Sequence, residues 1–445
     1  STLSQPPIPS MGGLCCTLCC AACSTADCEP LPECTYARTK EGNAGTLIVA
    51  TDERIQFVGR CIVAGTDLEY SCCSSLLRFI VSGPASTVGI TMFSPADGGR
   101  AKKMHAMNAS TNGTPEKAGA LMNIYVNGTC TGKIGVEACD TPKQYIIAEG
   151  LGDGDTLIEV TKVSEPAWGM VVVKGVNLSD GATLKDAPPA KRVIEFIGDS
   201  DTTAIGSLGP PTLNMFVALK NMMAWSDTDT SWAAHVARSF GVDHINTAAG
   251  GIGLMLTGDR YGPLQKAGPS PEHYEDRLCF NWGLGSKGDR YSAGDMPEVD
   301  LVVIWLGQND LIAGVGPGKI AKGTQAYRAQ LEVIRRHRPT TPVLCLYPLG
   351  LIHTSHPCNR LLNGKVKQQA ALATDIKEWA EAAAAELGGE KAGLYVRGVA
   401  MDPAFDPVQD FGLMYEIGHK AQRKWARGVV PHVKAIMGWN VVEGC

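Results

Sequence analysis

The feature that constrains the fold most is a change of pattern near residue 190. Between about residues 44 and 185, short apolar runs are separated by Gly, Asn, Asp and Pro, with no helical period between them. This rhythm is typical of an all-β sandwich. After residue 190, apolar strands alternate with helices, which indicates a parallel sheet with helices on both faces. We therefore predict a β-sandwich at 44–185 and an α/β domain at 191–440.

The α/β domain is expected to place a site at the carboxyl ends of its strands, as parallel sheets of this kind do. A chain of 445 residues is long enough for both domains, since single cores stop growing at about 250 to 300 residues. The predicted strands are 193–197, 244–247, 299–306, 341–347 and 394–399, and the predicted helices are 232–240, 324–337, 365–387 and 417–437.

Residues 1–36 form a third region, which is rich in cysteine. Seven of the 16 cysteines of the chain fall there, and several prolines prevent a long helix. We expect a disulfide-stapled segment, because adjacent cysteines without a nearby histidine favour disulfides over a metal site. This segment, or Cys445, is a candidate for self-association through intermolecular disulfides.

Four Asn-x-Ser/Thr sequons lie upstream of residue 190. Together with the cysteines they favour an oxidising, glycosylating compartment, so we expect a secreted protein. The candidate glycosylation sites are Asn108, Asn112, Asn127 and Asn177.

The charge balance excludes some partners. Forty basic and 45 acidic residues give a net charge of −5, with no basic stripe of the kind that binds phosphates. No run of 18 apolar residues predicts a membrane span. We expect neither nucleic acid nor membrane insertion, and no metal or organic cofactor.

Ser200 is the first candidate catalytic residue. The strand at 193–197 is followed by Gly198, Asp199 and Ser200, which places a hydroxyl at the carboxyl end of a buried strand. Glycine permits a tight turn there, and the serine backbone N–H can face a developing oxyanion. The alternative is that Ser200 only caps the following helix.

Two further segments favour the catalytic interpretation. Gly251 follows the second strand and offers an unhindered backbone N–H, and Asn309 follows the third strand and offers a side-chain amide. With the Ser200 N–H they predict a three-donor oxyanion hole. Taken alone, the Asn309-Asp310 pair is a common turn or helix cap.

This order of motifs resembles the SGNH (GDSL) hydrolase superfamily, whose blocks are a GDS serine, a glycine, a G-x-N-D asparagine and a late D-x-x-H histidine. The similarity extends over residues 45–440 to carbohydrate esterase family 2, through segments such as Arg54-Ile-Gln-Phe-Val-Gly-Arg, Ile124-Tyr-Val-Asn-Gly and the ending Ala435-Ile-Met-Gly-Trp. The resemblance implies an N-terminal jelly roll, a flavodoxin-like three-layer hydrolase domain, and removal of acetyl groups from carbohydrate through an acyl-enzyme.

The fourth block matches less well. One alignment takes Asp410 to Leu413 as a D-x-x-H block that has lost its histidine. Counting back from Trp439 puts the catalytic position near Glu416. A third alignment takes Glu416-Ile-Gly-His419 as the block, so that His419 is the base that exchanges a proton with Ser200, and Glu416, Asp410 or a backbone carbonyl orients it.

Two functions therefore stay open. The first is a secreted Ser-His esterase that removes acyl groups, most simply acetyl, from carbohydrate. The second is an inactive protein of the same fold that binds glycans or has a structural role. His353 and His356 are a weaker candidate for a second base or a metal pair, and Asp201 adds an unusual carboxylate beside the nucleophile. Trp225 and Trp282 are candidate sugar platforms, whereas Trp232 and Trp305 are expected in the core.

Overall fold

The computed structural model describes residues 45–95, 118–211, 221–255, 297–312, 320–349, 366–400, 410–412 and 416–442. The chain divides into two compact units, Ser1–Thr35 and Tyr36–Cys445, and all described residues lie in the second. None of the helices in these ranges has the length and apolar character needed to cross a membrane.

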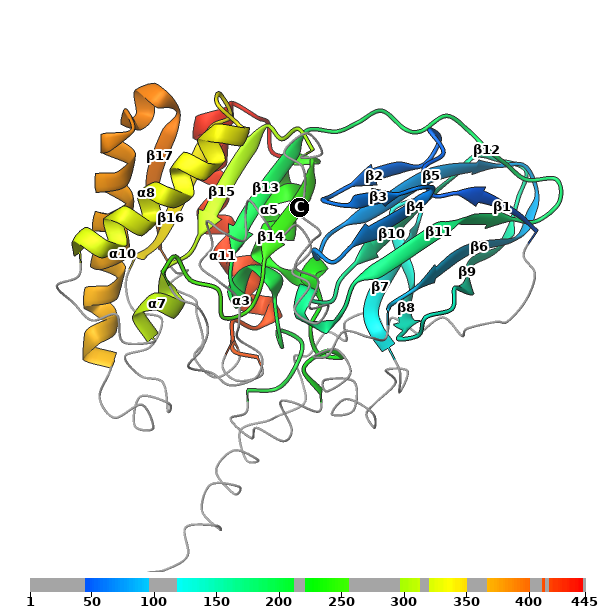
Figure 1. Cartoon of the computed structure of the whole chain (residues 1–445), viewed down its shortest axis with the longest axis horizontal. Helices are drawn as coiled ribbons and strands as arrows, with labels where there is room; N and C mark the ends of the chain where they lie inside the picture. Colours follow the sequence, from blue (N-terminus) through cyan, green and yellow to red (C-terminus); the bar gives the residue numbers. More distant parts are fainter. Residues whose placement is uncertain are drawn as a thin grey trace, which may run out of the picture. The chain divides into compact units, whose positions relative to one another are not determined.

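The first half is a sandwich of two antiparallel sheets, which confirms the predicted β-sandwich and its jelly-roll-like character (Figure 1). In one sheet the order is β3-β4-β11-β6-β9, and β1 also pairs with β11. In the other the order is β12-β5-β10-β7-β8, and β2 also pairs with β5. The strands are β1 (Thr46–Val49), β2 (Gln56–Val58), β3 (Ile62–Ala64), β4 (Asp67–Tyr70), β5 (Leu76–Ser82), β6 (Ala85–Phe93), β7 (Ala118–Val126), β8 (Thr129–Glu137), β9 (Lys143–Leu151), β10 (Thr156–Lys162), β11 (Val171–Leu178) and β12 (Thr183–Leu184).

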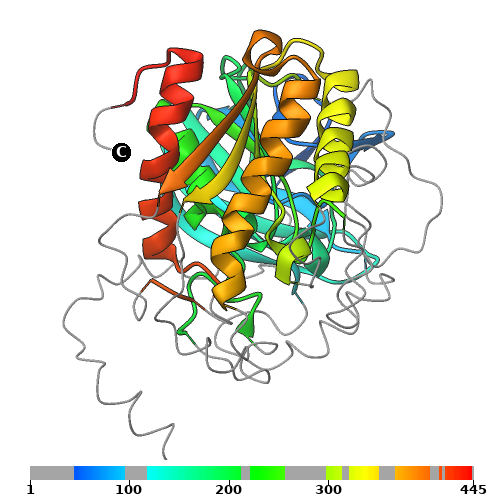
Figure 2. The ribbon, with the colours of Figure 1, turned by 90° about the vertical axis from the view of Figure 1, so that its left-hand side faces the viewer.

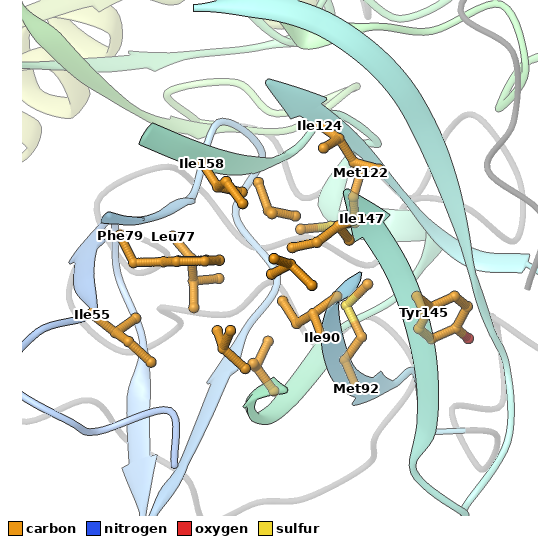
Figure 3. Packing of buried hydrophobic residues seen from close by; sticks show 14 of the residues in the cluster. Ile55, Leu77, Phe79, Ile90, Met92, Met122, Ile124, Tyr145, Ile147 and Ile158 are labelled. Carbon is orange, nitrogen blue, oxygen red and sulfur yellow. The ribbon is translucent and has the colours of Figure 1, made fainter. Parts of the chain in front are cut away.

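The sandwich core fills the space between the two sheets (Figure 3). Leu77 and Phe79, two residues apart on β5, lie on the same face because strand side chains alternate, and both are fully buried. Ile90 and Met92 repeat the pattern on β6 of the opposite sheet. Each such side chain contributes about 1.5–3 kcal/mol by burial, which is why the period-2 pattern predicts the fold well.

The second half is a five-stranded parallel sheet with the order β14-β13-β15-β16-β17. This is the flavodoxin-like order, whose switch point lies between the first and third strands of the domain. The predicted strands and helices are confirmed, with end points that differ by a few residues. They are β13 (Val193–Gly198), α5 (Trp232–Phe240), β14 (Asp243–Ala248), β15 (Leu301–Trp305), α8 (Ile320–His337), β16 (Val343–Leu349), α10 (Val366–Glu386), β17 (Leu394–Ala400) and α11 (His419–Met437), with short helices α3 (Ser200–Thr203), α7 (Gln308–Ile312), η1 (Pro166–Trp168), η2 (Thr228–Thr230) and η4 (Gly389–Ala392).

The helices cover both faces of the parallel sheet (Figure 2). Helices α8 and α10 pack on one face through a cluster that includes Leu331 and Trp379. Helices α5 and α11 pack on the other face, where Trp232, Trp305 and Trp425 are buried against one another. The prediction that Trp232 and Trp305 belong to the core is therefore confirmed.

Buried ion pairs join the sandwich to the parallel sheet near the amino-terminal ends of its strands. Arg78 of β5 donates two hydrogen bonds to the Asp243 carboxylate, at 2.6 and 2.8 Å. Arg60 donates to Glu195 at 2.7 Å, and Arg338 donates to the other oxygen of the same carboxylate at 3.1 Å. These contacts join the amino-terminal side of the sheet to the sandwich.

Candidate active site

Ser200 lies where β13 ends and α3 begins. Asp199 caps this short helix by accepting a hydrogen bond from the backbone N–H of Asp201 at 3.2 Å. Gly198 permits the turn, because a Cβ there would lie 2.0 Å from the Thr202 hydroxyl oxygen. Ser200 is partly exposed although its neighbours on both sides are buried. The serine hydroxyl is thus held at the carboxyl end of a central strand and remains accessible.

The loop after β14 is fixed at three points beside Ser200. Glu165, from the sandwich, accepts a hydrogen bond from the backbone N–H of Gly250. Asp310 accepts from the backbone N–H groups of Leu254 and Met255, both at 2.7 Å. Gly251 has φ +78°, a conformation that favours glycine. These contacts hold the loop that carries the candidate oxyanion donor.

Asn309 joins the three strand ends. Its side-chain amide donates to the carboxylate of Asp199 at 3.2 Å and to the backbone carbonyl of Ile252 at 2.9 Å. The structure therefore brings together Ser200, the Gly251 loop and Asn309, at the switch point of the sheet. Both amide hydrogens of Asn309 have acceptors, so donation to an oxyanion requires that one of them be shared or released.

Glu416 has a carboxyl whose pKa is raised. Burial, followed by the negative charge of Asp201, raises the pKa of Glu416 to about 8, against an opposing effect of the Ser200 side chain, and the charge of Glu165 adds to the rise. The backbone around it is fixed, because the Glu416 carbonyl accepts from the N–H of Gly412 at 2.9 Å.

The nucleophile is surrounded by further carboxyls. Burial, then the charges of Asp201 and Glu416, raises the pKa of Asp199 well above its usual range. Burial also raises the pKa of Asp201, against a hydrogen bond from Gln308, whose side-chain amide donates at 2.7 Å. Burial raises the pKa of Glu165, against the hydrogen bond from Gly250. In the part of the chain that the structure describes, no group of three or more His, Cys, Asp or Glu side chains has the arrangement of a metal site.

His419 is the first residue of α11. Its contacts within the described residues are with groups other than Ser200. Its backbone N–H donates to the Ser207 carbonyl at 3.0 Å. Burial lowers the pKa of the His419 ring, against a hydrogen bond to the Ser207 backbone, and the charges of Lys420 and Arg423 lower it further. Across the described residues, no hydrogen bond joins the ring to Ser200.

The hydrogen bond described for the Asp410 side chain is with Lys424, and not with Ser200. It is buried, and Lys424 donates to its carboxylate at 2.6 Å. Its charge acts on His419 by raising the pKa of the ring, but less than the other causes lower it. Of the residues predicted around the fourth block, Glu416 is therefore the one whose pKa is affected by Ser200.

The remaining predicted residues are divided between described and undescribed parts. Asn127 is exposed at a turn. Asn177 is buried and accepts a hydrogen bond from Thr91, which leaves no room for a glycan in the folded chain. No disulfide is found within the described ranges. Outside these ranges lie Asn108, Asn112, Trp282, His353, His356, Leu413, Cys445 and the cysteine-rich segment at 1–36.

Sequence reasoning missed Glu165 and Gln308 as parts of the site. Gln308 stands next to Asn309, so its position after a strand was a usable signal. Glu165 comes from the other domain and meets Gly250 across 85 positions of sequence. No local pattern predicts such a contact.

Comparison with known families agrees with the placement of Ser200, Gly251 and Asn309 at one edge of the parallel sheet. Residues 196–404 match the GDSL-like Lipase/Acylhydrolase family. The match includes Ser200, Gly251 and Asn309 and ends before Glu416 and His419. The chain therefore contains a GDSL/SGNH-type domain behind its jelly-roll-like sandwich.

Individual relatives are carbohydrate esterases. Over 200 residues, 45% of this chain, the sequence is 30% identical to cellulase/esterase CelE of Acetivibrio thermocellus, and this match spans 22% of that protein, about a fifth of its length. A family two carbohydrate esterase from Clostridium thermocellum, solved in complex with cellohexaose, has a TM-score of 0.63 at 21% identity, over 86% of this chain and 99% of that one. An acetyl xylan esterase from the rumen bacterium Butyrivibrio proteoclasticus has a TM-score of 0.64 at 16% identity, over 87% and 97%. At these identities the solved structures establish a shared fold.

Proposed function

We propose that this chain, which carries a GDSL/SGNH-type domain behind a jelly-roll-like sandwich, is a serine esterase that removes acyl groups from carbohydrate. The observation that carries the proposal is the convergence of Ser200, the Gly251 loop and Asn309 at the carboxyl ends of three adjacent strands. A hydroxyl, a side-chain amide and backbone N–H groups in this arrangement suit nucleophilic attack on an ester and stabilisation of the oxyanion.

The Gly251 backbone N–H is one of the candidate oxyanion donors. Its own conformation is fixed by the contacts on Gly250 and Leu254, and within the described residues it has no acceptor. An oxyanion donor that is already oriented contributes about 2.7–4 kcal/mol to the transition state in well-studied hydrolases. Preorganisation of this loop therefore supports an active enzyme.

Carbohydrate is proposed as the substrate class, with acetyl as the acyl group. The support is the shared fold with an acetyl xylan esterase and with an esterase solved in complex with cellohexaose, together with the partial match to cellulase/esterase CelE. Fold alone does not fix a substrate, so this part needs its own test.

The second candidate function is glycan binding without catalysis. It is favoured by one observation, that Ser200 has no hydrogen bond to a histidine within the described residues. In that case the protein would bind sugar near Ser200, and hydrolysis would not exceed the uncatalysed rate.

We also propose that the protein is secreted. The support is the crowding of cysteines at 1–36 and the exposed sequon at Asn127. A shift in mass after glycosidase treatment of the native protein, lost in the Asn127→Gln variant, is the expected result. An unchanged mass and reduced cysteines in the native protein would contradict secretion through an oxidising compartment.

The experiment that tests the esterase compares the intact chain with Ser200→Ala on p-nitrophenyl acetate and on acetylated xylan. We expect both substrates to release acid with the intact chain, and a fall of at least about 1,000-fold for Ser200→Ala. Equal rates for the two proteins would overturn the esterase. Binding of both proteins to the deacetylated polysaccharide, without hydrolysis, would favour the second candidate.

A further inference from the structure

We propose that the sandwich positions Ser200 for attack, through a buried polar cluster at its contact with the α/β domain. This inference rests on the esterase proposed above and gives the sandwich a part in its chemistry. Lys133 and Asp227 are positioning residues, because they act on Ser200 through the loop 204–208, which we call the α3 loop. The members of the interdomain cluster are Asn123, Tyr125, Lys133, Asp227 and Asp229.

Strands β7 and β8 contribute three polar side chains to the interdomain cluster. Asn123 of β7 lies directly opposite Lys133 of β8 in the strand register, so their side chains share one face of the sheet. Tyr125 lies two residues further along β7 and therefore points to the same face. Asn123 and Lys133 are 3% and 5% exposed. Polar groups buried to this extent need hydrogen-bond partners, which the α/β domain supplies.

Two carboxylates at the short helix η2 accept these hydrogen bonds. Lys133 donates to Asp227 at 2.8 Å, and both partners of this ion pair are buried. Tyr125 and Asn123 donate to Asp229, at 2.5 and 2.9 Å. Asp227 also caps η2, because its second oxygen accepts from the backbone N–H of Asp229 at 3.0 Å. The cluster therefore fixes both the position and the first turn of η2.

Hydroxyl groups join η2 to the α3 loop. Thr230, the last residue of η2, donates to the Asp227 carbonyl at 2.7 Å, and its hydroxyl oxygen lies 3.0 Å from that of Ser207. One residue before Asp227, the Ser226 hydroxyl accepts a hydrogen bond from the Gly206 backbone N–H at 2.8 Å. We therefore expect a displacement of η2 to move the α3 loop at two neighbouring residues.

The α3 loop holds Ser200 and the start of α11 together. The backbone N–H groups of Ala204 and Ile205 both donate to the Ser200 carbonyl. Ala204 has φ +54°, a left-handed conformation that is uncommon for a residue with a side chain and persists only where its surroundings fix it. The Ser207 carbonyl accepts from the His419 backbone N–H at 3.0 Å. The position of Ser200 therefore depends on the contacts that hold the α3 loop.

Ser200 is held from two directions, and the interdomain cluster controls one of them. From the sheet side, Asn309 donates at 3.2 Å to the carboxylate of Asp199, the residue before the nucleophile. From the other side, the α3 loop binds the Ser200 carbonyl. Release of the α3 loop would misplace the serine hydroxyl against a bound ester, and a misplacement of about 1 Å can lower a rate about 100-fold. We therefore expect the cluster to act on kcat more than on KM.

Substitution of Lys133 tests the positioning role. Lys133→Met keeps most of the aliphatic side chain and leaves the buried Asp227 without this cation. We expect kcat for p-nitrophenyl acetate to fall about 10- to 100-fold, with KM within about twofold of the intact chain. Lys133→Arg restores a cation and should recover most of kcat. A folded Lys133→Met chain with unchanged kcat overturns the positioning role, because a purely structural contact alters thermal unfolding and not kcat.

A double-mutant cycle tests whether Lys133 and Asp227 act through one contact. Asp227→Asn removes the charge and keeps a side-chain oxygen that can cap η2. We expect the double variant Lys133→Met/Asp227→Asn to be about as active as the slower single variant, because both substitutions break the same ion pair. Losses of kcat that multiply in the double variant would show independent effects and overturn the common path to Ser200.

Control variants separate this inference from the esterase itself. Lys322→Met removes an exposed lysine on α8 and should leave kcat unchanged. If Lys133→Met does not fold, Tyr125→Phe decides, because it removes only the hydroxyl that donates to Asp229. A lower kcat with unchanged KM in Tyr125→Phe supports the inference, and an unchanged kcat overturns it. An intact chain no faster than Ser200→Ala overturns the esterase, whereas an active intact chain with an equally active, folded Lys133→Met overturns this inference alone.

Discussion

The two ends of the parallel sheet contain buried carboxyls in opposite surroundings. At the amino-terminal side, Glu195 and Asp243 are paired with Arg60, Arg338 and Arg78. At the carboxyl side, the acids around Ser200 are surrounded by one another, and burial raises the pKa of each of them. The same side-chain chemistry thus serves to join two domains at one end and to hold protons at the other.

This difference indicates which end is built for stability and which for chemistry. Arginine pairs compensate the charge of a buried carboxylate, so removal of one partner leaves a buried charge without compensation and is costly. Buried carboxyls grouped close to one another disfavour ionisation, which costs stability at neutral pH. Strongly perturbed pKa values of this kind are typical of functional sites.

The largest expected effect is at the paired end. Glu195→Ala removes the common acceptor of Arg60, Arg338 and Thr247 and leaves buried cations without it. We expect a loss of about 3–5 kcal/mol in the free energy of unfolding, measured by urea denaturation. A loss below 1 kcal/mol would show that these pairs do not join the domains.

At the carboxyl side of the sheet, we expect a substitution to raise the free energy of unfolding instead of lowering it. An unfolded glutamate loses its proton near pH 4.3, while folded Glu416 keeps it to about pH 8, so its contribution to stability is lost as pH rises through this interval. Glu416→Gln should therefore raise the free energy of unfolding at pH 8 and leave it unchanged at pH 4. Destabilisation at both pH values would contradict the unpaired character of this carboxyl.

These two regions also differ in how far the sequence predicts them. Ser200, Gly251 and Asn309 each follow a strongly apolar strand, so the strand pattern alone places them at one edge of the sheet. Glu416 was one of several alternatives, because it lies in an irregular segment where three alignments disagree by a few residues. Pairs such as Arg78 with Asp243, and Glu165 with Gly250, join distant parts of the chain and have no local signature.

A smaller effect is expected where the sandwich meets the site. Glu165→Ala removes the acceptor for the Gly250 N–H and loosens the oxyanion loop, so we expect kcat to fall about tenfold, or about 1.4 kcal/mol. Glu165→Gln keeps an acceptor oxygen for this N–H, so it should keep most of kcat. An equal loss of kcat in the two variants would show that the hydrogen bond to Gly250 is not the reason for the effect.

The smallest effect is expected at an exposed ion pair, which serves as the control for the buried ones. Glu332→Ala removes an exposed partner of Arg328, at 2.7 Å, on the surface of α8. We expect a change within about 0.5 kcal/mol in the free energy of unfolding, because solvent screens such pairs. If this change equalled that of Glu195→Ala, burial would not be the reason for the difference.

The most direct test of the central claim, that Ser200 is an activated nucleophile, is covalent labelling of the intact chain with a fluorophosphonate at pH 6 and pH 8. Peptide mass mapping should locate the adduct on Ser200, with no adduct in Ser200→Ala. An unmodified Ser200 at both pH values, or an adduct on another residue, would contradict the account.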